Sequence, residues 1–371
     1  MNEVKKVLVK GSLSYNLGDD MFIKILANRY PSTMFYLIAP QDYSAFLNIP
    51  NIKIIGTPIN RIERVICKIL GVISSRLYAY CFGLFQKRFY KLYFNQVDAY
   101  IIIGGSLFKE AKHSQVTYSI NSAVIDLARS KPSFILGANF GPFSSESHLN
   151  NYRNYFSRFT DVCFRDYFSY NLFSDLNNVR VHKDIIFQAV LPIVEKDENE
   201  IGFVVVDFDK HINLGKYKPA YEDFIFKTAQ FYKNRNKSFC LIAFQTDEKK
   251  YVESLKKRIS GNELNEIKTL VYAGNLDDFL LKYGRFGTIF STRFHSMVLS
   301  FMYGQRNCPI IYNMKLLNFI QDINYNGPFV ELDKFDISDH FFLSVQEYMA
   351  SKYDFSVDSV LQFEELDKII S

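Results

Sequence analysis

Short apolar runs that end directly in glycine or in polar residues recur along this chain. The clearest is Tyr100–Ile103, which is followed at once by the small residues at 104–106. Unbroken runs of β-branched and large apolar residues are typical of strands in a parallel sheet that is buried on both faces. In such sheets, ligands bind beyond the carboxyl ends of the strands. The residues that we expect to border one binding crevice on this basis are Gly11, Gly104, Gly137 and Arg165.

A chain of 371 residues is longer than one hydrophobic core ordinarily supports, so two domains are expected. Strand-like runs fill the first half, break at the charged stretch 196–200, and begin again at Ile201. This alternation predicts an α/β protein with two doubly wound, Rossmann-like domains that face each other across a cleft. We place the N-terminal domain at residues 1–194 and the C-terminal domain at 195–339. The helical pattern of residues 340–371 is predicted to pack back on the N-terminal domain.

The segment Ser291–Ser296 carries the strongest chemical signal. It lies between a strand-like run and a helix-like run, so it should form the turn at a helix start. Unpaired backbone N–H groups and the positive end of the helix dipole favour a bound anion at such a place. Arg293 adds a planar, permanent cation, and His295 adds a side chain that exchanges protons near neutral pH. The segment therefore predicts a site that binds a small anion and moves a proton on it.

Seven short motifs occur in the order found in the polysaccharide pyruvyl transferase family, which the chain resembles over nearly its whole length. They are Asn16-Leu17-Gly18-Asp19, Gly104-Gly105-Ser106-Leu107, Gly141-Pro142-Phe143, Arg165-Asp166 with Ser169, Asp184-Ile185-Ile186-Phe187, Arg293-Phe294-His295 and Tyr312-Asn313-Met314-Lys315. Two positions depart from the family pattern. Ile103 stands where members usually carry a third glycine, and Phe294 replaces a common leucine. Neither change removes a charged group.

The resemblance implies a glycosyltransferase-B-like fold and a transferase activity. A pyruvyl group would pass from phosphoenolpyruvate to a sugar of a cell-surface polysaccharide or its lipid-linked precursor, forming a cyclic ketal and releasing phosphate. The residues assigned to catalysis are His295, Arg293 and Asp19. The residues assigned to substrate binding are Arg165, Lys315, Asn16, Gly18, Gly104, Gly105, Ser106 and Asp184. Phosphoenolpyruvate is a co-substrate; no cofactor is expected, and no metal, because the histidines lack zinc-site spacing.

The chemistry of phosphoenolpyruvate fits these residue types. Its carboxylate and phosphate need two or three cations, for which Arg165, Arg293 and Lys315 are suited. Ketal formation needs a proton at the methylene carbon, which His295 could supply. Asp19 or Asp184 could accept the proton of the sugar hydroxyl or orient that hydroxyl.

Each motif also has a structural interpretation. Gly104 and Gly105 suit a tight turn, Asp19 suits a helix cap, and Asp184 suits a loop tied to backbone amides. For the whole chain, the alternatives are a nucleotide-sugar-dependent glycosyltransferase of the same fold and a non-catalytic descendant that binds a glycan.

The charge and the cysteine content limit which classes of partner and which cellular compartment are expected. The net charge of +5 is spread out and too weak to argue for nucleic acid. Five cysteines without metal spacing suggest reduced thiols. The start of the sequence has no signal-peptide core, and no apolar stretch is long enough to span a bilayer. We expect a cytoplasmic protein, either free there or held at the inner face of the cytoplasmic membrane.

The stretch from Arg61 to Lys91 combines basic residues with apolar and aromatic neighbours. Two interpretations fit this composition. The stretch could lie on an anionic membrane surface, or it could form two core helices with basic residues on the solvent face.

Overall fold

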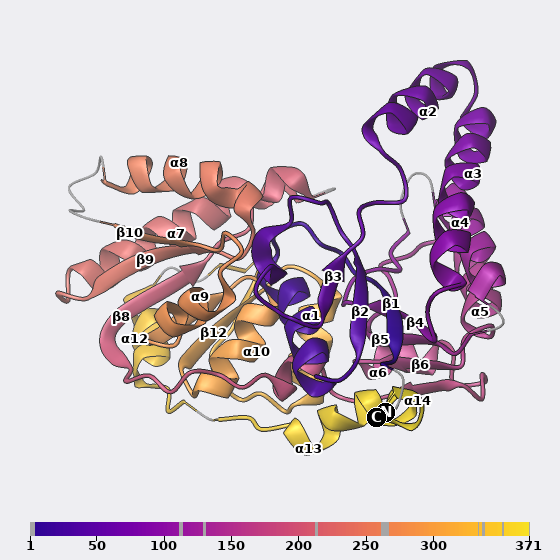
Figure 1. Cartoon of the computed structure of the whole chain (residues 1–371). Coiled ribbons are helices and arrows are strands. Elements are labelled where there is room, and N and C mark those ends of the chain that lie inside the picture. Colours follow the sequence, from indigo (N-terminus) through magenta and orange to yellow (C-terminus); the bar gives the residue numbers. More distant parts are fainter. Residues whose placement is uncertain are drawn as a thin grey trace. The chain divides into compact units, whose positions relative to one another are not determined.

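The computed structural model describes residues 4–110, 114–128, 131–211, 214–260, 267–332, 334–335, 338–350 and 352–370. The chain divides into two units, each built around its own parallel sheet (Figure 1). The first unit holds Met1–Leu13, Phe22–Ile185 and Val357–Ser371, and the second holds Ser14–Met21 and Ile186–Ser356. The prediction of two doubly wound α/β domains is confirmed.

The sheet of the first unit contains seven parallel strands within the described residues, in the order β3-β2-β1-β4-β5-β6-β7. The strands are β1 (Lys6–Lys10), β2 (Met34–Ile38), β3 (Ile52–Ile54), β4 (Ala99–Ile103), β5 (Ser133–Ala138), β6 (Asp161–Phe164) and β7 (Val179–Val181). Every residue of β4, β5 and β6 is buried, as expected for parallel strands that are covered on both faces. The helices are α1 (Leu17–Arg29), α2 (Arg61–Ile73), α3 (Ser75–Phe94), α4 (Ser114–Ala128), α5 (Glu146–Phe156), α6 (Tyr167–Asn171), α13 (Ser356–Ser359) and α14 (Glu364–Ile370). Of these, α1 begins in the segment Ser14–Met21 and α13 begins at Ser356, and both of these starting points belong to the second unit.

The sheet of the second unit repeats the same winding with six described strands, in the order β10-β9-β8-β11-β12-β13. The strands are β8 (Asp197–Val204), β9 (Ser238–Ala243), β10 (Lys268–Val271), β11 (Phe286–Ser291), β12 (Arg306–Ile311) and β13 (Val330–Glu331). The helices are α7 (Lys218–Lys233), α8 (Lys249–Ser260), α9 (Leu276–Tyr283), α10 (Phe294–Tyr303), α11 (Met314–Asp322) and α12 (Asp339–Glu347). In each sheet the chain starts at a middle strand, moves to one edge, and then crosses to the other side. The point of crossing is where ligands bind in such folds.

The unit boundaries differ from the predicted ones. The main segment of the second unit begins at Ile186, before the predicted limit at residue 194, and Ser14–Met21 also belongs to this unit. The charged stretch 196–200, where the strand pattern was expected to break, belongs to a strand. β8 starts inside it at Asp197, and its first residues form the exposed end of that strand. Helix α12 also belongs to the second unit, where Phe342 and Val345 are part of the core. Only Val357–Ser371 returns to the first unit.

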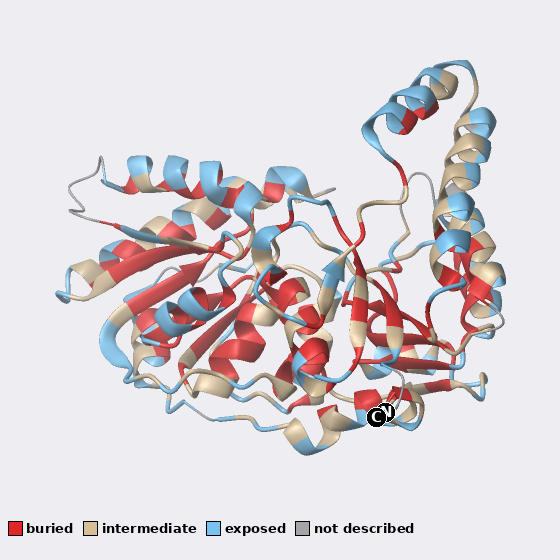
Figure 2. Ribbon diagram, viewed as in Figure 1, coloured by how far each residue is buried: buried red, intermediate tan, exposed pale blue. Residues whose placement is uncertain are grey.

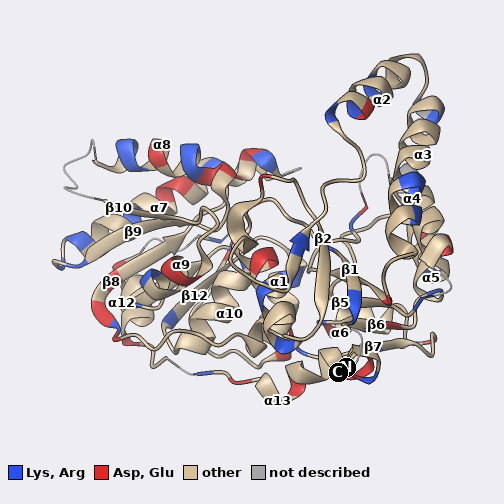
Figure 3. Cartoon of the chain, in the orientation of Figure 1, with Lys and Arg blue, Asp and Glu red and all other residues tan. Residues whose placement is uncertain are grey.

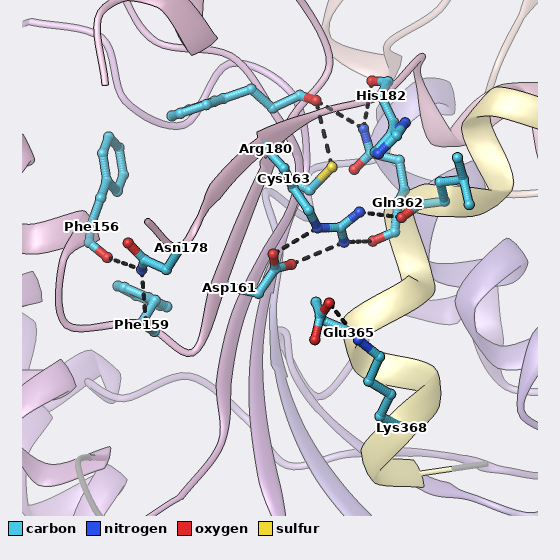
Figure 4. A network of polar contacts seen from close by, with 12 residues as sticks. Phe156, Phe159, Asp161, Cys163, Asn178, Arg180, His182, Gln362, Glu365 and Lys368 are labelled. Atoms are coloured by element: carbon cyan, nitrogen blue, oxygen red, sulfur yellow. Dashed lines mark hydrogen bonds and ion pairs between the residues drawn. The ribbon is translucent and has the colours of Figure 1, made fainter. Parts of the chain in front are cut away.

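A polar network fixes the returning C-terminal segment on the first unit (Figure 4). Arg180 on β7 donates to both carboxylate oxygens of Asp161 on β6, at 2.7 and 3.0 Å. The same guanidinium donates to the backbone carbonyls of Leu361 and Gln362. The side-chain amide of Gln362 in turn donates to the carbonyl of Phe164 at 3.0 Å. These bonds of Arg180 and Gln362 explain why the segment docks beside β6 and β7.

Helices α2 and α3 form a helical hairpin that runs out beyond the strands of the first unit (Figure 1). Near its C-terminal end, α3 is anchored by Tyr90 and Phe94, whose rings pack against Tyr100 of β4. Most of α2 and of the first part of α3 is exposed or only partly buried (Figure 2). None of the described helices is long and apolar enough to cross a membrane.

Candidate active site

Strand β11 leads into helix α10 through the predicted turn. Arg293 is the extended N-cap residue of α10, and the hydroxyl of Ser296 donates to the Arg293 carbonyl at 2.6 Å. The helix ends at Gly304, whose left-handed φ of 64° an L side chain rarely adopts. Because Phe294 and Met297 are buried, the helix is held with its second residue, His295, partly exposed at the positive end.

The loop Ser14–Met21 packs against this helix start within the second unit. The amide of Leu17 donates to the Phe244 carbonyl at 3.0 Å, and the side chain of Asn16 accepts from the amide of Gly18 at 3.1 Å. A Cβ atom on Gly18 would overlap the imidazole ring of His295. The ring therefore lies directly on the Gly18 backbone. The structure thus brings together Asn16, Gly18 and His295, which are far apart in the sequence.

Asp19 and Asp20, next to Gly18, have different environments. Asp20 is fully buried and accepts a hydrogen bond from the Tyr272 hydroxyl at 2.6 Å. Asp19 lies in the first turn of α1 and is partly exposed. The capping role weighed for Asp19 is taken by Asn16. Of the two carboxylates, Asp19 is the one that a substrate could reach.

Arg293 is held in an ion pair with the buried Glu248. Its Nη2 atom donates to Glu248 at 2.5 Å and to the side-chain oxygen of Gln245 at 2.8 Å. Burial is the largest single influence on the Arg293 guanidinium and acts to lower its pKa. The charge and hydrogen bond of Glu248, with the neighbouring Tyr312 and Asp247, together outweigh burial, so the pKa is raised. Burial also raises the pKa of Glu248 against the opposing effect of Arg293. Sequence reasoning missed Glu248, because it sits in the hydrophilic stretch 246–249, which is typical of a surface loop.

Lys315 lies beside the same helix start. It is the second residue of α11, whose N-cap Asn313 accepts from the Leu316 amide at 3.1 Å. Its ammonium nitrogen is 5.6 Å from the centre of the Phe294 ring, and that ring packs edge-on against His295. Lys315 and His295 therefore flank one aromatic side chain.

The remaining predicted residues form a second cluster, in the first unit. Arg165 donates to Asp184 at 2.7 Å and to the side-chain oxygen of Asn139 at 2.7 Å. The side chains of Arg165 and Asp184 are each only 1% exposed. A Cβ atom on Gly105 would overlap the Arg165 guanidinium, so Gly105 is required for the close approach. The cluster ties together the carboxyl ends of β4, β5 and β6.

Gly104 and Ser106 complete this cluster. Gly104 has a φ of 137°, which explains why glycine occupies this position. The hydroxyl of Ser106 donates to the side-chain oxygen of Asn139 at 3.3 Å. Both residues thus support the turn after β4, as the structural interpretation expected, and their contact with a substrate stays a prediction.

The sequence profile described as polysaccharide pyruvyl transferase matches residues 16–314. The chain belongs to this family. The match begins at Asn16 and ends at Met314, the first residue of α11, so it includes every predicted site residue except Lys315. The protein is therefore a transferase that modifies polysaccharide. No curated protein matches the chain.

Solved structures of other proteins share the fold. The Anabaena protein HepE, in complex with UDP and glucose, is 12% identical with a TM-score of 0.58, covering 99% of both chains. The UDP-GlcNAc 2-epimerase of Neisseria meningitidis, bound to UDP-GlcNAc, is 10% identical with a TM-score of 0.60, covering 98% of this chain and 99% of that one. The UDP-GlcNAc 2-epimerase of Methanocaldococcus jannaschii is 11% identical with a TM-score of 0.61, covering 99% of this chain and 100% of that one. The glycosyltransferase-B-like architecture is thereby confirmed.

Metal ligands do not gather in the described part of this pyruvyl transferase family member. Among the residues with a described position, no group of three or more His, Cys, Asp or Glu could hold a metal ion. That the reaction needs no metal remains a prediction.

Lys10 is a further residue of interest, which the sequence did not single out. It is the last residue of β1, beside β4, where the first sheet changes its direction of winding. Its ammonium donates to the side-chain oxygen of Asn121 on α4 at 3.0 Å. Burial lowers the pKa of Lys10 to about 8.

The substitution Lys10→Met is expected to stabilise the fold by about 1–3 kcal/mol at pH 7, because a tenfold change in proton affinity between the folded and unfolded chain corresponds to about 1.4 kcal/mol. Below the folded pKa of about 8, the wild type carries the full cost of a partly desolvated charge. Between that pH and the ordinary pKa of 10.5, the unfolded chain keeps a proton that the folded chain has lost, so wild-type stability rises with pH. The advantage of the variant should shrink over this window in urea unfolding curves. An advantage that stays constant with pH would contradict the burial of a charged Lys10.

Proposed function

We propose that this protein transfers a pyruvyl group from phosphoenolpyruvate to a saccharide, forming a cyclic ketal and releasing phosphate. One observation carries the proposal: the N-termini of α1 and α10 meet where His295 lies on Gly18. Two positive helix ends favour a dianionic group, and the side chain between them is one that exchanges protons near neutral pH. Lys315, at the start of α11 beside Phe294, adds a cation.

Atoms and protons balance in the proposed reaction. His295 gives a proton to the methylene carbon, which becomes the methyl group and leaves an oxocarbenium-like centre. One sugar hydroxyl adds to this carbon and loses its proton to Asp19. The C–O bond to phosphate then breaks, and a second hydroxyl of the sugar closes the ketal ring. Of the two hydroxyl protons, one replaces the proton given by His295 and the other leaves with phosphate.

The two arginines have positioning roles in this proposal. Arg293 is engaged by Glu248 and Gln245, and Arg165 is engaged by Asp184 and Asn139. The first pair fixes the loop before α10, and the second fixes the strand ends of the first unit. Direct contact of either arginine with phosphoenolpyruvate remains a prediction. The anion contacts that we favour are the helix N-termini and Lys315.

The acceptor and the location are further parts of the proposal. We assign as acceptor a sugar of a cell-surface polysaccharide, or its lipid-linked precursor, and as location the cytoplasm. The family supports the saccharide. The lipid-linked form agrees with the exposed hairpin of α2 and α3.

The variant His295→Ala tests the proposal. General acid catalysis contributes typically about 10²–10⁴-fold, so kcat should fall by that factor. The assay follows phosphate released from phosphoenolpyruvate in the presence of methyl glycosides and nucleotide-linked sugars as acceptors. In D₂O the ketal methyl group should gain one deuteron, which NMR detects. Full activity of His295→Ala would remove the catalytic assignment.

A binding measurement separates this proposal from nucleotide-sugar transfer. HepE was solved with UDP and glucose. UDP-glucose is therefore the appropriate ligand to compare with phosphoenolpyruvate. Ligand at 100 times its Kd stabilises the native state by about 2.7 kcal/mol and raises the melting temperature. We expect this rise with phosphoenolpyruvate and not with UDP-glucose. The opposite result would favour the glycosyltransferase alternative and leave His295 without its proposed role.

A further inference from the structure

The apolar face of α2 points outward rather than into the protein. Six aliphatic residues at helical spacing share this face, and all are exposed: Ile62, Val65, Ile66, Ile69, Val72 and Ile73. They cover an arc of roughly 120° on the helix. Val72 keeps 89% of its surface accessible. An amphipathic helix of a globular protein normally turns such a face toward the core, so this one is built for another apolar partner.

The orientation of α2 is fixed by its opposite face. Glu63 and Cys67 are buried there, and Arg88 of α3 forms an ion pair with Glu63. Glu63 also closes a capping box with Asn60, through hydrogen bonds of 2.9 and 3.0 Å. Farther along, Gly71 lies against Tyr78 of α3, because a Cβ atom there would be 3.3 Å from that ring. Contacts on this packed face therefore hold the aliphatic face outward.

Basic residues border the exposed aliphatic face. Arg61, Arg64 and Lys68 lie on the strip of α2 next to it and are exposed. On α3, the exposed Leu77, Tyr80 and Leu84 form a second apolar row. Figure 3 shows the basic residues on both helices. From Arg61 to Lys91 the hairpin holds seven basic residues against one glutamate, whereas the whole chain has a net charge of only +5.

We propose that the helical hairpin is a docking element for an anionic lipid bilayer. The aliphatic face of α2 enters the boundary between headgroups and acyl chains, and the neighbouring Arg and Lys side chains contact lipid phosphates. A second copy of the chain fits this surface less well, because two hairpins with the same excess of positive charge repel each other. The burial and charge of the hairpin carry this proposal whatever reaction the protein catalyses. The sequence alone left open a pair of core helices, which the outward aliphatic face argues against.

Flotation of the full chain with vesicles tests the proposal. Wild type is expected to float with vesicles of phosphatidylcholine and phosphatidylglycerol and to stay at the bottom with phosphatidylcholine alone. At about 1 M salt, where the Debye length is about 3 Å, binding should weaken strongly. Arg64→Gln with Lys68→Gln should lower the partition coefficient by about fivefold for each charge removed. Val65→Ser, Ile69→Ser and Val72→Ser combined should abolish flotation.

Matched controls use the same types of exposed side chain elsewhere. Val190 and Ile193 are exposed apolar residues of the second unit, and Lys249 and Lys257 are exposed on α8. Their Ser and Gln variants should float like wild type, and melting curves confirm folding in every case. Absence of flotation with anionic vesicles, or equal flotation of all variants, would overturn the proposal. So would a lipid-free dimer that the α2 triple variant converts to a monomer, since a second copy would then cover this face.

Discussion

Gly18→Ala is expected to lower transferase activity by at least about 100-fold while the fold stays intact. The added methyl group would overlap the imidazole of His295, which must move or rotate to make room. Displacement of a catalytic group by about 1 Å can cost about 10²-fold in rate. Gly18 lies in the first turn of α1 and its φ is not in the left-handed region. Alanine is therefore compatible with the backbone, and the loss of activity should come only from displacement of the His295 imidazole.

Gly83→Ala is the matched control for this prediction. Gly83 lies inside α3, and a Cβ atom there meets nothing within 4 Å. In a lipid-free assay this variant should keep wild-type activity and gain up to about 1 kcal/mol in stability, because alanine favours the helix over glycine. Melting curves check both variants, and the NMR signal of His295 reports movement of the ring. Full activity of Gly18→Ala together with a shifted ring signal would show that the position of His295 does not set the rate.

The strands and the start of α10 could be predicted because their signals are local. In an unbroken run such as Tyr100–Ile103, the residues on both faces of the strand are apolar, so the composition alone indicates that both faces are buried. The segment Ser291–Ser296 likewise marks the passage from a strand to a helix. Order along the chain then allowed the family to be identified from motifs that are individually weak. Local pattern and motif order were sufficient for the fold class and for most residues of the two clusters.

The partners of the buried charges could not be predicted, because they are far apart in the sequence. Nothing near Arg293 points to Glu248, and nothing near Asp20 points to Tyr272. The pattern of α2 defines an apolar face but not the direction in which that face points, which depends on its packing against α3. The limits of the units escaped for the same reason. The return of the C-terminal segment to the first unit was predicted, but its start at Val357 depends on contacts with strands more than a hundred residues earlier.

Arg165 shows how burial changes the interpretation of a predicted residue. As a sequence feature it suggested a cation for the substrate. In the structure its guanidinium is covered by Gly105 and paired with Asp184 and Asn139. Desolvating both charges is costly, and their attraction offsets this cost only while both partners are present. The pair therefore makes the carboxyl ends of three strands depend on one contact.

Asp184→Ala is accordingly expected to destabilise the protein by about 3–5 kcal/mol, because it leaves the buried Arg165 without its counter-charge. Asp184→Asn keeps the shape and should cost less, and the double variant Asp184→Leu with Arg165→Met should recover much of the loss. Urea unfolding followed by circular dichroism gives these differences from the midpoints. The control is Asp175→Ala, which removes the carboxylate from the more exposed ion pair with Arg153 in the same unit and should change stability little. If Asp184→Ala proves as mild as Asp175→Ala, the Arg165 charge must find solvent or another acceptor, and Arg165 regains its place as a direct ligand of the substrate.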